Sequence, residues 1–256
     1  MKTLRVEKTD TITTIYLNRP SQRNSLTIEL MDELRALVDQ LRADDTTRIV
    51  IITGAGKTFS AGADVEMLTT IGEAYTPEET RDVISKWRAT FDALEQLPQI
   101  TIAAINGLAF GGGVVLALAC DFRLASTRAI FGLPEIKLGM VLALGGTQRL
   151  TRLIGVSAAK EMILRGRNVT AIEAQRMGLA HRIAEPGDLM GLAKSWAERA
   201  VNYSPRALAL AKRLVDQSFD RDANASAEAE TLAQVELLHS PEFLGRIKAV
   251  KENGEI

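Results

Sequence analysis

Two short and almost wholly apolar segments limit the fold of this chain more than any other feature. They are residues 49–53 and 100–105, and both are rich in isoleucine. A strand that is apolar along its whole length, rather than at every second residue, is typical of a sheet covered on both faces. The sequence therefore predicts an α/β fold in which helices cover a buried sheet.

Strand, loop and helix patterns alternate from the N-terminus to about residue 150. Leucines recur at helical spacing from Leu30 to Leu41, and residues 77–97 form a second amphipathic segment that ends at Pro98. We expect further strands at residues 11–17 and 122–125, and a glycine-rich loop at residues 54–64.

Beyond this region the pattern predicts helices only. Thr170 and Glu173 form a capping box, and Ser157 is expected to cap the preceding helix. Further helices are expected at residues 187–202, 205–218 and 226–239. We divide the chain into a core of residues 1–195 and a C-terminal helical region of residues 196–256.

The composition argues against several classes of protein. The net charge of −1 offers no general attraction to nucleic acid or to an anionic membrane. No apolar run approaches the roughly 20 residues of a membrane-spanning helix, and the polar N-terminus is unlike a signal peptide. A single cysteine, Cys120, excludes an internal disulfide, and the two histidines form no metal-ligand spacing. We expect a cytoplasmic protein, or an organelle-matrix protein in a eukaryote, without a metal site.

One segment imitates a nucleotide-binding loop. Residues 54–58 read Gly-Ala-Gly-Lys-Thr and follow a buried strand. The phosphate-binding pattern needs another glycine five residues before Gly56, and this chain has Ile51 there. Nucleotide hydrolysis is therefore not expected.

Three consecutive glycines, residues 111–113, open an apolar helix after the second buried strand. Each glycine destabilises a helix by about 0.5–1 kcal/mol relative to alanine, so close packing alone seldom explains three. Amides at a helix start have no partner inside the helix, and they stabilise an oxygen that gains negative charge. The small residues 60–64 allow another close backbone approach to a ligand, although a plain tight turn is the simpler interpretation.

A lone carboxylate, Glu135, completes this pattern. It follows Pro134 and lies among Leu133, Ile136 and Leu138. Burial by these neighbours would raise the pKa of Glu135 toward the range of a general base, whereas an ordinary surface glutamate is the alternative. The amides and the acid together predict a site that holds an oxyanion and moves a proton beside it.

A series of motifs resembles the crotonase superfamily, the enoyl-CoA hydratase/isomerase family. The motifs keep the family's order within residues 12–180 and comprise segments 17–20, 59–64, 105–113, 119–123, 131–135 and 145–150. The resemblance implies a spiral of repeated ββα units, with an acyl-CoA site in residues 1–195. It also implies a homotrimer or homohexamer built through residues 196–256, and no cofactor, because CoA is part of the substrate.

The same resemblance assigns roles to single residues. The amides of Ala63 and Gly112 match those that hold the thioester oxygen, and Glu135 matches a catalytic glutamate. CoA is expected near the loops that contain Arg23, Ser25, Leu26, Ser60, Ala61 and Asp64. The acyl pocket is expected to be lined by Val115, Leu138 and Leu142.

The chain departs from the hydratases of this family at Val115, where they usually carry a second glutamate. An aliphatic residue there, combined with Glu135, resembles Δ3,Δ2-enoyl-CoA isomerases, which move a proton from C2 to C4 with one carboxylate. A second departure is the apolar segment 141–144, which would exclude water from Glu135. The resemblance favours an isomerase. A hydratase, another thioester-enolate reaction such as decarboxylation, and an acyl-CoA-binding homologue without turnover stay open.

Overall fold

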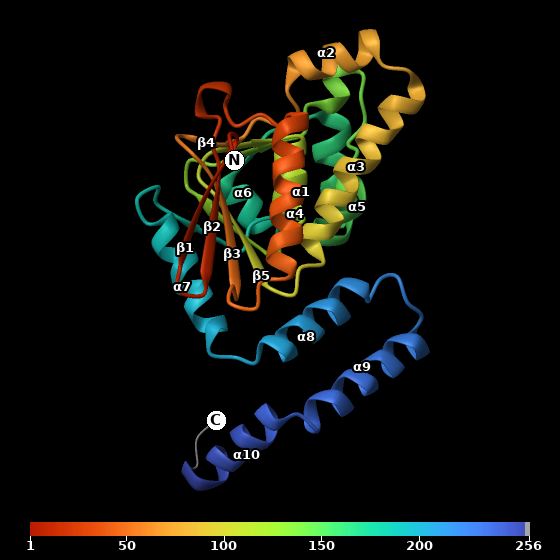
Figure 1. Cartoon of the computed structure of the whole chain (residues 1–256). Helices are drawn as coiled ribbons and strands as arrows, with labels where there is room; N and C mark the ends of the chain where they lie inside the picture. Colours follow the sequence, from red (N-terminus) through yellow and green to blue (C-terminus); the bar gives the residue numbers. More distant parts are fainter. Residues whose placement is uncertain (254–256) are drawn as a thin grey trace.

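A computed structural model describes residues 1–253 of the chain (Figure 1). The larger of its two sheets has the strand order β1-β2-β3-β5-β7-β10. Its strands are β1 (Leu4–Thr9), β2 (Ile12–Leu17), β3 (Ile49–Gly54), β5 (Ile100–Ile105), β7 (Phe122–Ser126) and β10 (Arg182–Ala184). Neighbouring strands are parallel except for the antiparallel pair β1 and β2.

The smaller sheet has the order β4-β6-β8-β9 and contains very short strands. They are β4 (Thr58–Ser60), β6 (Leu108–Phe110), β8 (Ile130–Gly132) and β9 (Val169–Thr170). Strands β4, β6 and β8 follow β3, β5 and β7 directly in the chain, and a helix comes after each pair. Each repeat thus gives one strand to each sheet, which confirms the predicted spiral of ββα units.

The helices carry most of the remaining chain. They are α1 (Ile28–Arg42), α2 (Val65–Ala74), α3 (Pro77–Glu95), α4 (Gly112–Leu118), α5 (Gly146–Arg165), α6 (Ala171–Arg176), α7 (Leu189–Val201), α8 (Pro205–Gln217), α9 (Ala223–Leu238) and α10 (Pro241–Asn253). The 3-10 turns are η1 (Pro20–Gln22) and η2 (Glu135–Leu138). The predicted capping box of Thr170 and Glu173 is present at the start of α6.

Helices cover both faces of the larger sheet, as the apolar strands predicted. On β3, Val50 and Ile52 belong to the core cluster that includes α1 and α3. The alternate residues Ile49 and Ile51 pack in a second cluster with α7. Figure 1 shows α1 and α3 on one side of this sheet and α7 on the other.

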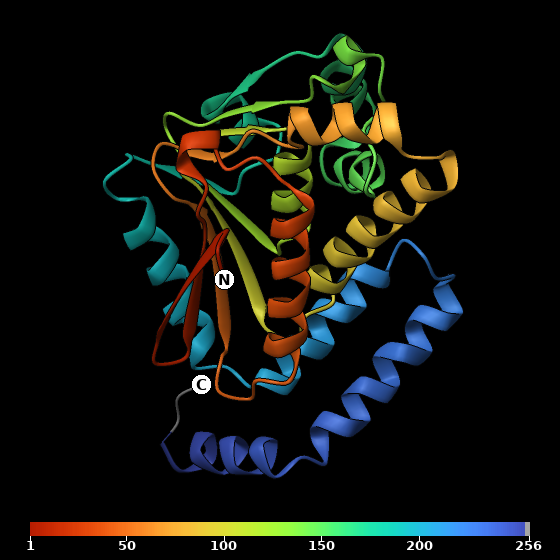
Figure 2. The same ribbon diagram turned by 45° about the horizontal axis from the view of Figure 1, so that its top comes forward.

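The C-terminal helices extend away from this core. Lys212 of α8 forms a largely buried ion pair with Asp121 at 2.8 Å, which fixes α8 beneath the sheet. Helix α9 runs back along α8, and α10 continues beyond the end of α9 (Figures 1 and 2). In the link between α7 and α8, Ser204 donates to Glu242 of α10 at 2.6 Å, and the Asn202 carbonyl accepts from Arg246 of α10 at 3.0 Å. The predicted boundary at residue 195 falls inside α7, which packs on the larger sheet. The role of the C-terminal region in assembly stays a prediction.

Three expectations need correction. Ser157 does not cap a helix; Gly155, with φ of 78° and ψ of 162°, interrupts α5, and Ser157 lies within the segment that follows. Strands β9 and β10 occur where only helices were expected, and strand β1 and helix α10 were not predicted. The glycine-rich loop expected at residues 54–64 is interrupted by strand β4, and its first part, the segment that resembles a phosphate loop, is the turn between β3 and β4.

Candidate functional site

The predicted site residues follow three neighbouring strands of the smaller sheet. Ala63 comes after β4, Gly112 after β6 and Glu135 after β8. Strands β4, β6 and β8 are adjacent and parallel, so their C-terminal ends lie along one edge. Residues 63, 112 and 135 are separated in the sequence, but each occupies a corresponding place in a ββα repeat.

Gly111 brings the start of α4 against Glu135. Its φ of 48° and ψ of −119° form a backbone conformation that residues with a side chain avoid. A Cβ atom at this position would lie 2.7 Å from Oε1 of Glu135. The absence of a side chain at Gly111 therefore leaves room for the carboxylate beside the helix start.

Glu135 is the first residue of η2 and is half-buried. Its Oε2 atom is buried and has no hydrogen-bond partner within residues 1–253. Burial raises the pKa of Glu135, and a hydrogen bond from its own backbone opposes the shift only in part. The structure agrees with the predicted desolvation, which makes Glu135 a stronger base than an exposed glutamate.

The amides of Ala63 and Gly112 lie close to each other beside this acid. Leu26 holds the first loop, because its amide donates to the Gly62 carbonyl at 2.8 Å and its carbonyl accepts from Asp64 at 3.0 Å. An added Cβ at Gly112 would lie 3.8 Å from the Ala63 nitrogen. No protein acceptor for either amide is found in the described part of the chain. Two unpaired N–H groups are what an oxyanion hole requires.

Gly62 makes this approach of the two loops possible. Its φ is +86°, and a Cβ atom there would lie 2.6 Å from the Phe110 carbonyl oxygen and 3.3 Å from the Gly112 nitrogen. Glycine at position 62 is therefore a requirement of the close contact between the ends of β4 and β6.

Several residues expected near CoA hold these loops together instead of facing solvent. Ser25 donates to Asp64 Oδ2 at 2.8 Å and accepts from Arg19 at 3.0 Å. Burial alone would raise the pKa of Asp64, but hydrogen bonds and the charge of Arg19 lower it below its ordinary value. Ser60 donates to the Asn24 carbonyl at 2.8 Å. These polar side chains therefore organise the loops.

The other three residues of this set differ in exposure. Leu26 is fully buried, and Ala61 is half-buried and donates its amide to the Arg23 carbonyl at 2.9 Å. Arg23 is exposed and has a φ of 51°. Arg23 is thus the member of the set whose side chain is free to reach a bound ligand.

Val115 and Leu142 come together at the start of α5. They are 1% and 5% exposed. A Cβ atom at Gly146 would lie 2.6 Å from Val115 Cγ2 and 2.9 Å from Leu142 Cγ, so both side chains meet the same point of α5. Leu138, the third residue expected in the acyl pocket, is 63% exposed and lies on the outer part of η2.

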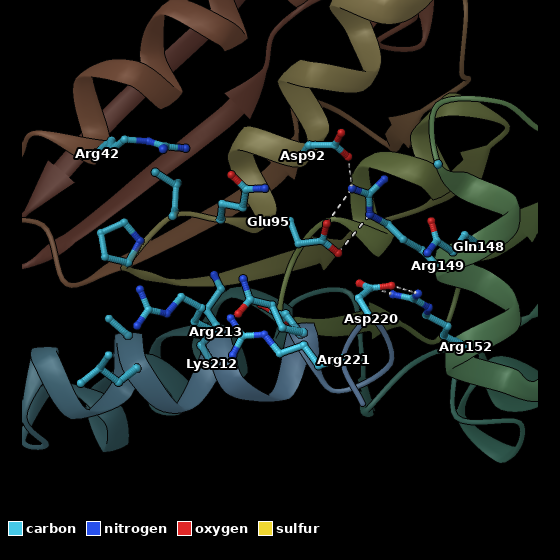
Figure 3. A pocket seen from close by; sticks show the side chains of 18 of the residues that line it. Arg42, Asp92, Glu95, Gln148, Arg149, Arg152, Lys212, Arg213, Asp220 and Arg221 are labelled. Atoms are coloured by element: carbon cyan, nitrogen blue, oxygen red, sulfur yellow. Dashed lines mark hydrogen bonds and ion pairs between the residues drawn. The ribbon is translucent and has the colours of Figure 1, made fainter. Parts of the chain in front are cut away.

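Arg149 supports the loop before α5, and no role for this residue was predicted from the sequence. Its guanidinium donates to Asp92 Oδ1 and Glu95 Oε2, both at 2.6 Å, and to the Leu144 carbonyl at 3.0 Å (Figure 3). Leu144 has a φ of 60°, which is uncommon for leucine and needs support from its surroundings. The sequence placed Arg149 in a motif, but its acidic partners lie 54 and 57 residues away on α3.

A cleft of about 820 Å³ lies between α3, α5 and α8. Its lining is mainly charged, and several of these side chains pair with one another, including Arg152 with Asp220 (Figure 3). Glu135, Ala63 and Gly112 do not line it. The groups suited to proton transfer therefore lie elsewhere, at the edge of the smaller sheet.

Among residues 1–253, no group of three or more His, Cys, Asp or Glu side chains could hold a metal ion. In the same range no helix has the length and hydropathy needed to cross a membrane.

Comparison with known proteins gives consistent matches over almost the whole chain. A family model described as enoyl-CoA hydratase/isomerase matches residues 7–254. The chain is 36% identical over 229 residues to the short-chain-enoyl-CoA hydratase of Clostridium acetobutylicum, which covers 89% of this chain and 86% of that protein.

Solved structures give the same picture. The enoyl-CoA hydratase of Bacillus anthracis superposes with a TM-score of 0.92 at 39% identity, over 98% of this chain and 96% of that chain. A Thermobifida fusca protein whose crystal structure contains acetoacetyl-CoA superposes with a TM-score of 0.85 at 32% identity, over 93% and 95% of the two chains.

Proposed function

The chain belongs to the enoyl-CoA hydratase/isomerase family, the crotonase superfamily, and on this basis we propose that it converts 3-enoyl-CoA to 2-enoyl-CoA. One observation carries the proposal. A single desolvated carboxylate, Glu135, lies beside two unpaired amides, while the position of a second acid is filled by the buried Val115. Proton transfer needs one base, whereas hydration in this family usually relies on two carboxylates.

The proposed reaction uses Glu135 twice. Its carboxylate takes a proton from C2 of the 3-enoyl thioester, and the electron pair moves toward the thioester oxygen to form a dienolate. The amides of Ala63 and Gly112 donate to that oxygen, and each such donor is typically worth about 2.7–4 kcal/mol in the transition state. The protonated Glu135 then returns the proton to C4, so the double bond shifts to C2–C3 and no atoms are gained or lost.

The substrate class is supported by the relatives. The Thermobifida fusca protein holds acetoacetyl-CoA, so a CoA thioester is the ligand we propose for this chain, with no separate cofactor. Arg23, exposed on the loop beside Ala61, is placed to meet the negatively charged CoA. The acyl chain would lie against Val115 and Leu142 and, toward solvent, Leu138.

Hydration of 2-enoyl-CoA is the second candidate, because the curated relative and the solved structure named above are hydratases. It would require Glu135 alone to position and activate water. The buried, apolar surroundings of Val115 favour isomerisation over that reaction.

A product assay on matched 3-enoyl-CoA and 2-enoyl-CoA substrates tests the proposal. We expect the 3-enoyl substrate to give 2-enoyl-CoA without hydroxyacyl-CoA, and Glu135→Gln to lose turnover while it still binds acyl-CoA. Hydroxyacyl-CoA as the main product would establish the hydratase instead. Binding of acyl-CoA with no reaction of either substrate would favour decarboxylation or a non-catalytic role.

We also infer that the C-terminal helices mediate homotrimer or homohexamer formation. Helices α9 and α10 lie at the outside of the fold (Figure 2). Both expose several large apolar side chains. These side chains are Leu232, Val235, Leu238, Leu244 and Ile247. Exposed apolar surface of this kind is typical of a subunit interface.

A further inference from the structure

Leu142 and Val115 are both almost fully buried, and their side chains come together at Gly146, the first residue of α5. We propose that Leu142 is a specificity-determining residue, which fills the place of a second carboxylate and keeps water out of the site. This inference rests on the proposed function, in which Glu135 acts as a single base. Leu142 would then determine whether the enzyme isomerises or hydrates its enoyl-CoA substrate.

The packing around Gly146 supports the first part of the proposal. A single added carbon at Gly146 would lie 2.6 Å from Val115 Cγ2, 2.9 Å from Leu142 Cγ and 3.2 Å from Leu142 Cδ1. Side chains from α4 and from the loop before α5 therefore converge on one glycine of α5. Both are almost fully buried, so the two side chains are shielded from solvent where they meet.

The position of Val115 on α4 relates this contact to Glu135. The Val115 amide donates to the Gly111 carbonyl at 3.1 Å, so Val115 follows Gly111 by one helical turn. Gly111 is the residue against which the Glu135 carboxylate lies. A carboxylate at residue 115 would therefore start one helical turn from Gly111 and, like Val115, would have Leu142 as a neighbour at Gly146.

The loop that carries Leu142 is held firmly. Thr147 Oγ1 donates to the Leu142 carbonyl at 2.8 Å, and Arg149 donates to the Leu144 carbonyl at 3.0 Å. Leu144 keeps a left-handed backbone conformation, and such conformations persist only where surrounding contacts enforce them. These bonds fix the backbone on both sides of residue 143 and so hold Leu142 in its place beside Gly146.

The test uses Leu142→Ala, Val115→Glu and the double variant, with Val115→Gln/Leu142→Ala as the matched uncharged control. Leu164→Ala, a leucine truncation at an exposed site on α5, controls for general effects. Thermal unfolding identifies the variants that keep a cooperative fold, and Leu142→Val replaces Leu142→Ala where the latter does not fold. The measurements are the products from both enoyl-CoA substrates and the titration of the Glu135 carboxyl carbon by NMR, assigned with Glu135→Gln.

We expect Leu142→Ala to move the Glu135 titration toward the ordinary glutamate value of 4.5, because water reaches the carboxylate. We expect Val115→Glu/Leu142→Ala to hydrate 2-enoyl-CoA at least about tenfold faster than Val115→Glu alone or the glutamine control. An unchanged Glu135 titration in Leu142→Ala, or equal hydration by Val115→Glu with and without Leu142, would overturn the proposal. Failure of the wild-type protein to isomerise would reject the proposed function only, since the titration still decides whether Leu142 excludes water.

Discussion

At the scale of single residues, burial without a stabilising partner among residues 1–253 makes Glu135 a stronger base. Its Oε2 atom has no hydrogen-bond donor among residues 1–253, and no charged side chain contributes to the rise in its pKa. A cation near the carboxylate would stabilise the ionised form and make it a weaker base. Burial without a partner therefore favours proton acceptance, at a cost in stability.

That cost can be measured through the pH dependence of unfolding. The pKa of Glu135 is raised above 4.5 in the folded state, so its contribution is most favourable below pH 4.5 and is lost as the pH rises through the folded pKa. Glu135→Gln should therefore unfold at a higher temperature than wild type at pH 8, and the difference should vanish below pH 4.5. In parallel, wild-type kcat/KM should rise with pH through a pKa above 4.5. An equal melting temperature for the two proteins at pH 8 would show that Glu135 is not desolvated.

Gly111 provides a second residue-scale prediction. Gly111→Ala should reduce stability and abolish most activity, because the new Cβ would collide with Glu135 Oε1 and the φ of 48° disfavours alanine. Gly72→Ala is the matched control, since Gly72 is exposed on α2 and a Cβ there meets nothing within 4 Å. The control should keep activity and gain up to about 1 kcal/mol of stability. Equal kcat/KM values for the two variants would show that Gly111 does not determine the position of the Glu135 carboxylate.

At the scale of elements, ion pairs between Arg149 on α5 and two acids on α3 hold the loop before α5 in place. Arg149 is 11% exposed and joins Asp92, Glu95 and the Leu144 carbonyl. Lysine keeps the charge but cannot form this fork of hydrogen bonds. The loop that presents Leu142 thus depends on a residue whose guanidinium faces the cleft shown in Figure 3.

Arg149→Lys should therefore lower the free energy of unfolding by about 1.5–3 kcal/mol, the range for hydrogen bonds to charged groups, and reduce kcat. Arg152→Lys is the control, because Arg152 pairs with the exposed Asp220 and such pairs are worth at most about 1 kcal/mol. Denaturant unfolding and steady-state kinetics give the comparison. A loss of stability no larger than that of the control would show that the fork does not hold the loop.

The longer elements could be predicted from the sequence because each has its own pattern. The leucine spacing of α1 and the apolar runs of β3 and β5 are examples. Strands β4, β6 and β8 have only three residues each, too few to show a period, and they form by pairing with one another. The break at Gly155 was missed because glycine within a helical pattern does not by itself reveal its φ.

The candidate site, like the fold, could be predicted from the sequence only where its residues carry a local signal. The glycine run and Glu135 carry local chemical signals, and the structure brings them together. The internal bonds of Ser25 and Asp64, and the role of Arg149, depend on partners far away in the sequence. No local pattern reports such partners, so these roles needed the fold.

At the scale of the whole molecule, repetition of the ββα unit builds the site. Three successive repeats deliver Ala63, Gly112 and Glu135 to the same edge of the smaller sheet. Strand order thus sets the relative positions of the two amides and the acid, and helix packing on the larger sheet keeps them rigid. Helices α9 and α10 lie away from this edge (Figure 2), and their part in assembly is a prediction.

The assembly prediction follows from those helices. Light scattering after gel filtration should give three or six times the chain mass of 27.8 kDa. Leu232→Asp combined with Val235→Asp should yield smaller species. Charges on this exposed apolar face of α9 would oppose its burial in a subunit interface. Val65→Asp, at an equally exposed apolar residue on α2, should leave the mass unchanged. A wild-type mass of one chain would contradict the inference.

The central claim is that one shielded carboxylate carries a proton from C2 to C4. The most direct test supplies a 3-enoyl-CoA with deuterium in place of both hydrogens at C2, in ordinary water, and locates the label in the product. If Glu135 transfers the proton, part of the 2-enoyl-CoA should carry deuterium at C4. Glu135 would return the deuteron that it removed from C2 before this deuteron exchanges with solvent. Product with only solvent hydrogen at C4 from the first turnover, or hydroxyacyl-CoA in its place, would contradict a single base protected from water.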